Sequence, residues 1–289
     1  MSLFKSLFGG GTSKANISTR FELLRETISG TMSEFHMARD RKTDQIVGLK
    51  ILDKEKTRAL EARFVGVKKP KEGEIAVTME HPRIVKTFEH GLTTNGEQYV
   101  VMEFLDGPGL NSLIVARSTL LAGRRMPLIR QMAEALAAVH RAGYIHRDVC
   151  PRNFVVDKQC TSLKLIDFGL SVPATPPFMQ PGNRTGTANY MAPEVVRRRP
   201  TSQKLDIFAF GVTVYELCAF ELPWPRGAGL AAMAHGSVEP TDIRTYCPKI
   251  DKRLELAINA CIESEPDKRP ASMEEFLKLI KGVEQEIAA

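Results

Sequence analysis

The stretch that decides the fold reads His-Arg-Asp-Val-Cys-Pro-Arg-Asn at residues 146–153 and Lys-Leu-Ile-Asp-Phe-Gly at residues 164–169, with an apolar run between them. Two isolated carboxylates, Asp148 and Asp167, and the amide of Asn153 are thus carried by loops between short apolar segments. Their oxygens are the hard ligands that Mg²⁺ prefers, and a carboxylate can also accept the proton of a hydroxyl. The stretch therefore predicts a site that holds metal ions and an attacking hydroxyl together.

These motifs resemble those of the protein kinase family. His-Arg-Asp-x-x-x-x-Asn is similar to the family's catalytic loop, while Asp167-Phe168-Gly169 and Ala192-Pro193-Glu194 are similar to the two ends of its activation segment. The resemblance covers nearly the whole chain. It implies an α+β fold of two lobes: a small N-lobe with an antiparallel β-sheet and one helix, called αC in kinases, and a larger, mainly α-helical C-lobe.

The family pattern also sets the expected boundaries. Residues 1–19 are expected to form a flexible segment, residues 20–284 the kinase domain and residues 285–289 a tail. Within the domain the resemblance implies an N-lobe over about 20–103, a linker between lobes over about 103–109 and a C-lobe over about 110–284. The chain is long enough for one large domain with a sizeable core.

Local patterns predict strands first and helices later. Strands are predicted at residues 46–52, 85–90 and 98–102, with hairpin turns at 42–45 and 93–96. Ile75, Ala76 and Met79 recur at helical spacing, which predicts a helix over residues 72–79. Pro82 ends it, because proline removes an amide donor and disfavours helix in the residue before it.

The second half of the chain reads as helices. After Pro127, apolar residues of one helical face recur up to Val139, and Gly143 is a stop signal. Residues 206–219 are almost wholly apolar and predict a buried central helix. Another helix is predicted at residues 254–261, and Ser272-x-x-Glu275 has the form of a capping box that opens the last helix.

Composition narrows the class of partners and the compartment. The net charge is +6, but 34 acidic residues are interspersed with 40 basic ones, so the sequence argues only weakly for acidic partners and against nucleic acid. The five cysteines show no regular spacing, which favours buried thiols in a reducing compartment over a disulfide framework.

Segments that would place the chain in or across a membrane are not recognisable. No apolar run approaches the roughly 20 residues of a membrane span, and the N-terminus lacks the apolar core of a secretory signal, so a cytoplasmic protein is expected. Leu3, Phe4, Leu7 and Phe8 do lie at helical spacing. A disordered tail is favoured there over contact with a membrane or a partner helix. The oligomeric state stays open.

The resemblance assigns four residues to catalysis. Lys50 would hold the α- and β-phosphates of ATP and pair with a glutamate of the αC helix, for which spacing favours Glu72 over Glu74. Asp148 would accept or orient the proton of the substrate hydroxyl. Asn153 and Asp167 would bind the metal, Mg²⁺ or alternatively Mn²⁺.

The nucleotide-binding part departs from the family pattern. Of the three family glycines in the phosphate loop only Gly30 remains, because the other two fall on Ile28 and Ser33. Phe35 replaces the usual valine and Gly48 the usual alanine, and we expect the two changes to compensate each other. The predicted nucleotide-binding residues are Lys50, Glu72, Gly30, Phe35, Gly48, Met102 and, in the linker, Glu103 and Leu105.

A second departure concerns the acceptor amino acid. Cys150 stands where kinases for serine and threonine usually carry a lysine, and Arg152 resembles the arrangement in some tyrosine kinases, so it could supply the missing charge. Thr187 matches a threonine that serine/threonine kinases keep near the substrate residue, which favours serine and threonine. Candidate phosphorylation sites are Thr175, Thr185 and Thr187, with Thr185 preferred, and Arg147 could pair with a phosphate there.

The predicted function is Mg²⁺-dependent transfer of the γ-phosphate of ATP to a serine or threonine hydroxyl of a protein. The alternative is a pseudokinase, a binding or scaffolding module with weak or no transfer, which the altered phosphate loop and Cys150 favour. A small-molecule kinase fits less well. By resemblance, Glu194 should pair with Arg269, and Asp206 should anchor the catalytic loop. Arg197–Arg199 is read as a solvated cluster rather than a docking site for an acidic substrate.

Overall fold

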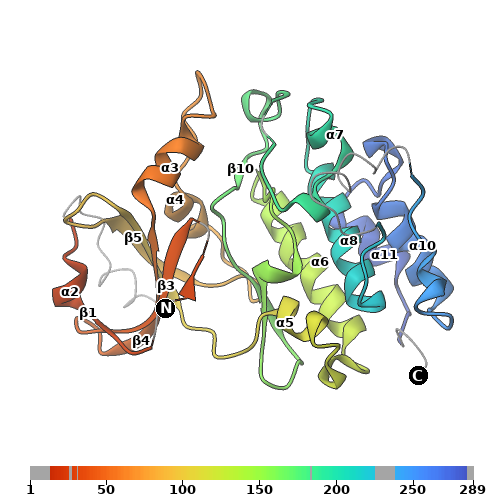
Figure 1. Cartoon of the computed structure of the whole chain (residues 1–289), viewed down its shortest axis with the longest axis horizontal. Coiled ribbons are helices and arrows are strands. Elements are labelled where there is room, and N and C mark those ends of the chain that lie inside the picture. The colour runs from red at the N-terminus through yellow and green to blue at the C-terminus, as the bar shows by residue number, and fades with distance from the viewer. Residues whose placement is uncertain (1–13, 26–27, 31, 183, 225–237, 285–289) are drawn as a thin grey trace. The chain divides into compact units, whose positions relative to one another are not determined.

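The computed structural model describes residues 14–25, 28–30, 32–182, 184–224 and 238–284 and divides into two compact units (Figure 1). The smaller unit comprises Met1–Glu80 and Val85–Leu105, and the larger one His81–Ile84 and Asp106–Ala289. The division after Leu105 falls inside the linker predicted for residues 103–109. His81–Ile84, expected in the N-lobe, belongs to the larger unit because Ile84 bridges to Leu165 there.

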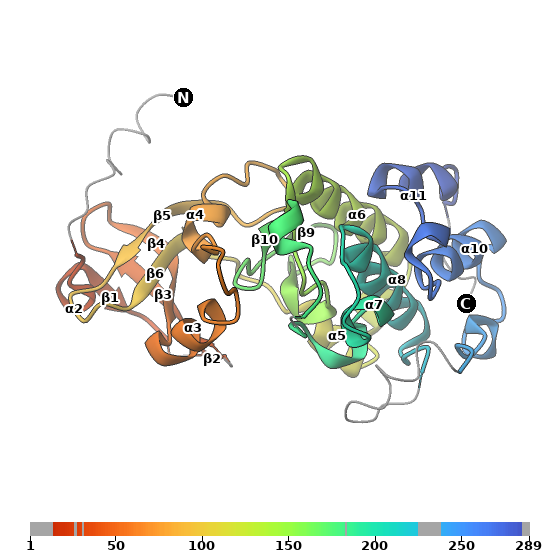
Figure 2. The ribbon, with the colours of Figure 1, turned by 90° about the horizontal axis from the view of Figure 1, so that it is seen from above.

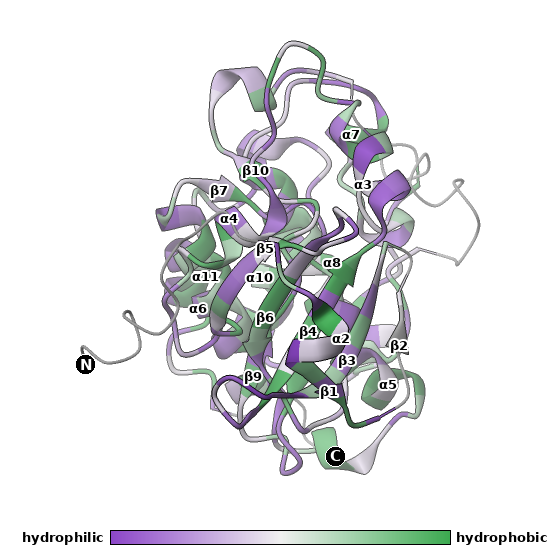
Figure 3. Ribbon diagram, turned by 90° about the vertical axis from the view of Figure 1, so that its left-hand side faces the viewer, coloured by the Kyte–Doolittle hydropathy of each residue, from purple (hydrophilic) through white to green (hydrophobic). Residues whose placement is uncertain are grey.

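An antiparallel sheet of six strands builds the smaller unit. The order is β1-β3-β4-β6-β5, with β2 paired to β3. The strands are β1 (Phe21–Leu23), β2 (Ile28–Ser29), β3 (Ser33–Asp40), β4 (Gln45–Leu52), β5 (Thr87–Leu92) and β6 (Gln98–Glu103). Strands β4 and β6 are largely hydrophobic (Figure 3). The predicted strands at 46–52, 85–90 and 98–102 are thus present, with small shifts of their ends.

The two faces of this sheet differ in content, because successive side chains of a strand alternate between faces. One face carries the apolar core of the unit, made of Phe21, Ala38, Val47, Leu49, Tyr99 and Val101. The opposite face carries Lys50 together with Phe35 and His90, which occupy the same row of the strand register.

Among the described residues the helices of this unit are α2 (Ile17–Arg20), α3 (Lys54–Glu61) and α4 (Glu72–Ala76). The segment expected to be flexible, residues 1–19, includes residues 14–19, which the structure describes with defined contacts. Ala15 exchanges backbone hydrogen bonds with Leu92 and Thr94, and Arg20 forms ion pairs with Asp40 and Glu89. The expected behaviour of residues 1–13, including membrane contact, and of the tail at 285–289 lies outside the described residues.

Helices dominate the larger unit. The α-helices in its described part are α5 (Leu110–Val115), α6 (Arg125–Arg141), α7 (Pro193–Val196), α8 (Lys204–Ala219), α10 (Lys252–Cys261) and α11 (Met273–Leu279). Short strands are β7 (Tyr144–Ile145), β8 (Phe154–Val156), β9 (Leu163–Leu165) and β10 (Val172–Pro173). Single 3-10 turns are η1 (Thr119–Leu121), η2 (Pro151–Asn153), η3 (Pro176–Phe178), η4 (Ala188–Tyr190), η5 (Ile243–Thr245) and η6 (Pro266–Lys268).

The core of this unit lies along α8, which contacts α6 and α10 (Figures 1 and 2). Every residue from Leu205 to Ala219 is buried, as the apolar composition predicts. In the described part of the chain no helix is long and apolar enough to cross a membrane. A sheet unit with a helix and a larger, mainly helical unit confirm the predicted α+β kinase-like class.

Candidate active site

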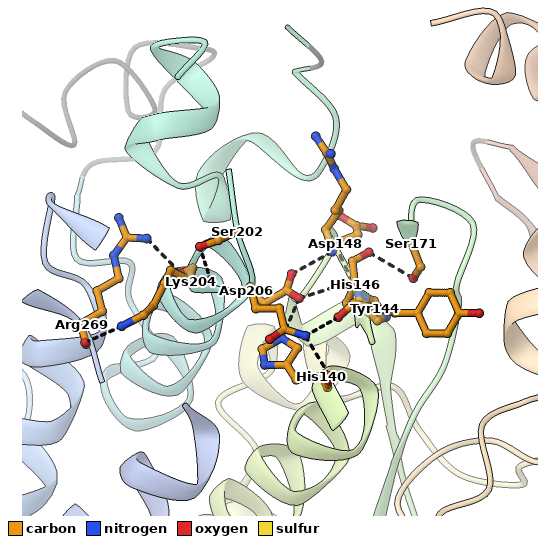
Figure 4. Close-up of polar contacts among 11 residues, drawn as sticks. His140, Tyr144, His146, Asp148, Ser171, Ser202, Lys204, Asp206 and Arg269 are labelled. Atoms are coloured by element: carbon orange, nitrogen blue, oxygen red, sulfur yellow. Dashed lines mark hydrogen bonds and ion pairs between the residues drawn. The ribbon is translucent and has the colours of Figure 1, made fainter. Parts of the chain in front are cut away.

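The first turn of α8 holds the loop that carries Asp148 through the side chain of Asp206 (Figure 4). Asp206 is fully buried, and its carboxylate accepts the backbone amides of His146 at 2.7 Å and Arg147 at 2.8 Å. Its Oδ2 also lies 2.9 Å from Nε2 of His140 on α6. Arg147 has a φ of 69°, a left-handed conformation that is unfavourable for a residue with a Cβ atom. The hydrogen bonds to Asp206 therefore hold a strained turn in place. The predicted anchoring role of Asp206 is confirmed.

The charge state of Asp206 follows from these partners. Burial alone would raise the pKa of the carboxyl. The hydrogen bond and charge of His140, with the charge and amide of His146, outweigh burial and hold the pKa of Asp206 below its ordinary value. The carboxylate therefore stays ionised while it organises the loop. His140 was not anticipated from the sequence, because nothing in its local pattern marks a contact 66 positions away.

Asp148 is the centre of a small polar cluster. Its Oδ1 accepts the amide of Thr187 at 2.9 Å and the Thr187 hydroxyl at 2.8 Å. Its Oδ2 accepts the side-chain amide of Asn153 at 2.9 Å, and the same Asn153 nitrogen donates to the Asp148 carbonyl at 2.7 Å. The predicted catalytic carboxylate is thereby held in one orientation from two sides.

Asn153 and Asp167 offer the oxygens expected of metal ligands. Because the nitrogen of the Asn153 amide faces Asp148, its Oδ1 points the other way. The Ile166 amide donates to the Asn153 carbonyl at 2.8 Å and ties the two metal-ligand candidates together through the backbone. Asp167 has a φ of 68° and accepts the Gly169 amide at 2.9 Å. The donor set is hard oxygen on fixed backbone, which fits Mg²⁺ or Mn²⁺.

Cys150 and Arg152 both reach Thr187. The Arg152 guanidinium donates to the Thr187 hydroxyl at 3.0 Å, and the Cys150 sulfur lies 3.7 Å from the same oxygen. Burial, together with the charge of Asp148, raises the pKa of the Cys150 thiol, so the thiol stays neutral. The positive charge next to Thr187 is therefore supplied by Arg152 and not by residue 150. All five cysteines are buried and free, as the sequence indicates.

The candidate phosphorylation sites differ in access. Thr185 is only 7% exposed, and its hydroxyl has no hydrogen-bond partner among the residues that the structure describes. It lines a small cavity together with Arg147 and Gly186. Thr175 is exposed, and the Thr187 hydroxyl is engaged with Asp148. Modification of the preferred candidate, Thr185, would therefore require this segment to open first.

Lys50 and Glu72 form a buried ion pair in the smaller unit. Lys50 Nζ lies 2.6 Å from Glu72 Oε1, and the two side chains are 10% and 5% exposed. Glu74, the rival candidate, is exposed and accepts the backbone amide of Lys71 at the start of α4. The structure therefore places Glu72 and not Glu74 against the lysine.

The face of the sheet that carries Lys50 also carries the substituted nucleotide-site residues. A Cβ atom added to Gly48 would lie 2.8 Å from the Phe35 ring and 3.1 Å from Met102. The aromatic ring thus occupies the space that a methyl group at residue 48 would need. Gly30 lies at the turn between β2 and β3, where its amide donates to the Ser33 carbonyl at 2.8 Å.

Glu103 and Leu105, the two nucleotide-binding residues predicted in the linker, do not belong to the set of side chains on the face of Lys50. The Glu103 carboxylate accepts the Lys86 amide at 2.7 Å, and the register puts its side chain on the face opposite Lys50. A nucleotide contact of Glu103 would therefore involve its main chain. Leu105 is half-buried at the end of the smaller unit.

The predicted Glu194–Arg269 pair is confirmed. The Arg269 guanidinium bridges both carboxylate oxygens of Glu194, at 2.8 and 2.9 Å, with almost no exposure of either side chain. It also donates to the carbonyls of Glu263, Ser264 and Lys204. Of the arginine cluster, Arg197 and Arg199 each lie 3.8 Å from Glu265, which fits the solvated interpretation.

Comparison with known proteins identifies protein kinases as relatives of this chain. Residues 21–279 match the family model described as "Protein kinase domain". The chain is 29% identical over 268 residues to the serine/threonine-protein kinase pkn3 of Myxococcus xanthus, covering 89% of this chain and 48% of that protein. It is 27% identical over 269 residues to PrkC of Bacillus subtilis, covering 92% and 40%, respectively. It is 32% identical over 265 residues to CBL-interacting serine/threonine-protein kinase 7 of Arabidopsis thaliana, covering 90% and 59%.

The chain spans about half the length, or less, of the first curated relatives it matches. Within its own length the match leaves few residues out at either end. The matched region contains the ion pair of Lys50, the loop of Asp148 and the Asp167 turn described above. The chain belongs to the protein kinase family.

Proposed function

We propose that the protein transfers the γ-phosphate of ATP to a serine or threonine hydroxyl of a protein substrate. The observation that carries this proposal is the fixed Asp148 carboxylate, oriented by Thr187 on one oxygen and by Asn153 on the other. Phosphoryl transfer needs positioning and charge neutralisation more than covalent chemistry. A preorganised carboxylate beside hard oxygen donors supports that requirement.

Each residue has one task in this proposal. Asp148 accepts or orients the proton of the substrate hydroxyl. Lys50, held by Glu72, binds the α- and β-phosphates. Asn153 and Asp167 would hold Mg²⁺, or alternatively Mn²⁺, which when bound neutralises phosphate charge. Arg152 adds positive charge near the acceptor hydroxyl, because its guanidinium already contacts Thr187.

Serine and threonine are the acceptors we favour. The relatives compared above are named serine/threonine-protein kinases, and in this chain the Thr187 hydroxyl donates a hydrogen bond to Asp148. Because Arg152 resembles the arrangement in some tyrosine kinases, the test below also looks for phosphate transfer to tyrosine. The protein substrate itself follows from the family and not from any contact described above.

The test is transfer of labelled phosphate from Mg²⁺·ATP to the protein itself and to generic protein substrates, with acid hydrolysis of the products. We expect label on serine or threonine. Asp148→Asn should lower the rate about a hundredfold to ten-thousandfold, because it removes the proton acceptor but keeps the shape. Asp267→Asn, at an exposed aspartate of η6, is the matched control and should leave the rate unchanged.

The outcomes separate the proposal from its rival. Label that appears equally in wild type and Asp148→Asn would contradict the role of Asp148. Label on tyrosine would correct the acceptor. If no label appears with Mg²⁺ or Mn²⁺, the result favours a binding module without phosphoryl transfer.

The second candidate is a binding module that keeps the fold without transfer. Two observations favour it: only Gly30 survives of the three phosphate-loop glycines, and Cys150 replaces a cationic residue with a neutral thiol. Such a module would bind nucleotide or a partner, yet show no difference between wild type and Asp148→Asn. The same assay therefore decides between the two.

A further inference from the structure

A row of directly opposed residues crosses the sheet of the smaller unit. The register pairs Lys50 of β4 with Val100 of β6, and Val100 with His90 of β5. Opposed residues of antiparallel strands point to the same face. Lys50 and His90 therefore face the same side of the sheet, two strand spacings or about 10 Å apart.

Helix α4 lies against β5 on this side (Figures 1 and 2). Two consecutive residues of the helix meet the two positions of the row. Glu72 reaches Lys50 at 2.6 Å, while Gly73 sits on His90. A Cβ atom added to Gly73 would lie 2.3 Å from the His90 Cβ and 2.5 Å from its Cγ, closer than real Cβ atoms approach other atoms. Only glycine allows the helix to come this near to the strand.

The shortness of α4 makes this contact decisive. The sequence predicts a helix over residues 72–79, but it ends at Ala76 and has little more than one turn. Few side chains can therefore fix its distance from the sheet. Glu72 must be within hydrogen-bond reach of Lys50, so a displacement of the helix of about 1 Å would separate the pair.

We propose that the contact between Gly73 and His90 sets the distance of α4 from the sheet and thereby holds the Glu72 carboxylate on Lys50. Gly73 is a positioning residue in this view, because it touches neither phosphate nor metal. The kinetic consequence rests on the proposed function, whereas the effect on the Lys50–Glu72 pair does not. The two are therefore tested separately.

The first test reads the ion pair directly. The native protein is treated with an amine-acylating reagent, and modification of Lys50 is followed by mass spectrometry, with Glu72→Gln as the reference for a broken pair. Gly73→Ala should acylate at the rate of Glu72→Gln, and wild type much more slowly. Alanine favours a helix more than glycine does, so a loss of protection cannot come from a weaker helix.

Substitutions of His90 supply matched controls. His90→Gly removes the Cβ that opposes the added methyl group, so Gly73→Ala/His90→Gly should regain the protection of wild type. His90→Ala keeps that Cβ and should not restore it. Protection of Lys50 in Gly73→Ala alone, or equal rescue by both His90 substitutions, would overturn the proposal. So would a wild type that reacts as fast as Glu72→Gln.

The second test uses kinetics and changes no strand residue. Gly73→Ala should lower kcat/KM for phosphoryl transfer about a hundredfold, the effect of a misplacement near 1 Å. Added to Glu72→Gln it should lower kcat/KM no further, because the pair is already lost. Full additivity would contradict the positioning role. Correct Lys50 protection in a protein that transfers no phosphate would keep this inference and overturn the proposed function.

Discussion

At the scale of single residues, two departures from the family pattern turn out to be neighbours. Phe35 and Gly48 lie on adjacent strands and on one face, and the ring fills the space that a larger residue 48 would occupy. Sequence spacing identified both substitutions, and the register explains why they occur together. An aromatic ring in this position presents a broad apolar surface beside Lys50.

Phe35→Val should weaken nucleotide binding. The smaller side chain leaves Gly48 uncovered and removes aromatic surface, which we expect to raise the Kd for Mg²⁺·ATP about three- to tenfold. Gly48→Ala should weaken binding too, because its methyl group collides with the ring. The double variant Phe35→Val/Gly48→Ala should recover the affinity of wild type. Isothermal titration gives the three values, and unchanged or tighter binding by Phe35→Val alone would contradict compensation.

The motif residues could be predicted because their spacing along the chain is characteristic. Asp148 and Asn153 share one loop, and Asp167 follows the paired strands β8 and β9, where the Ile166 amide meets the Asn153 carbonyl. His140 and His90 could not be predicted, because each matters through a partner brought near by packing and not by spacing.

At the scale of elements, α8 is both the buried central helix of the larger unit and the element that anchors the loop of Asp148. Asp206 stands in its first turn, where a negative charge is favoured by the helix dipole, and accepts two amides of the catalytic loop. The buried helix thereby fixes the position of the loop. The lowered pKa of Asp206 has a direct consequence for the stability of the protein.

Asp206→Asn should destabilise the protein at neutral pH and much less in acid. A carboxyl whose folded pKa is depressed contributes stability above its unfolded pKa, near 4, and loses that contribution as pH falls through the folded value. We expect a loss of about 3 kcal/mol at pH 7. Urea unfolding from neutral pH to about pH 3 should show the gap to wild type narrowing below about pH 4. A gap that stays constant with pH would contradict the assignment.

Helices with an apolar face were predictable, and those without one were not. The long helices α6, α8 and α10 bury many residues and have clear patterns. In α3 the only buried residue is Thr57, and its sequence has just two apolar residues, Ala59 and Leu60, too few to mark a buried face. Its start signal was present, since Asp53 accepts the Lys56 amide as an N-cap. Helix α4 ends earlier than its pattern suggests, at Ala76.

At the scale of the whole molecule, distant parts of the larger unit are joined by one buried ion pair. Glu194 stands at the end of the segment that begins at Asp167, and Arg269 precedes α11, 75 positions after Glu194. The family pattern predicted this pair, whereas propensity alone would not, because no local rule connects the two residues. The contacts of Ala15 could not be predicted for a related reason, because its backbone partners are Leu92 and Thr94, more than 70 positions later.

Glu194→Gln should reduce the free energy of unfolding by about 3–5 kcal/mol, because it leaves the buried Arg269 guanidinium without its counter-charge. Glu265→Gln is a suitable control. That residue is exposed and forms only long ion pairs, so its substitution should change stability by about 1 kcal/mol or less. Chemical denaturation measures both, and equal effects would contradict the importance of the buried pair.

In the proposed reaction, the cluster around Asp148 also determines the direction from which the substrate hydroxyl can arrive. A carboxylate offers about four lone-pair positions. Among the described residues three donors fill three of them: the Thr187 amide and hydroxyl on Oδ1, and the Asn153 amide on Oδ2. The remaining position is on Oδ2, beside Asn153. An incoming hydroxyl that gives up its proton to this carboxylate thus has one available lone pair and one line of approach.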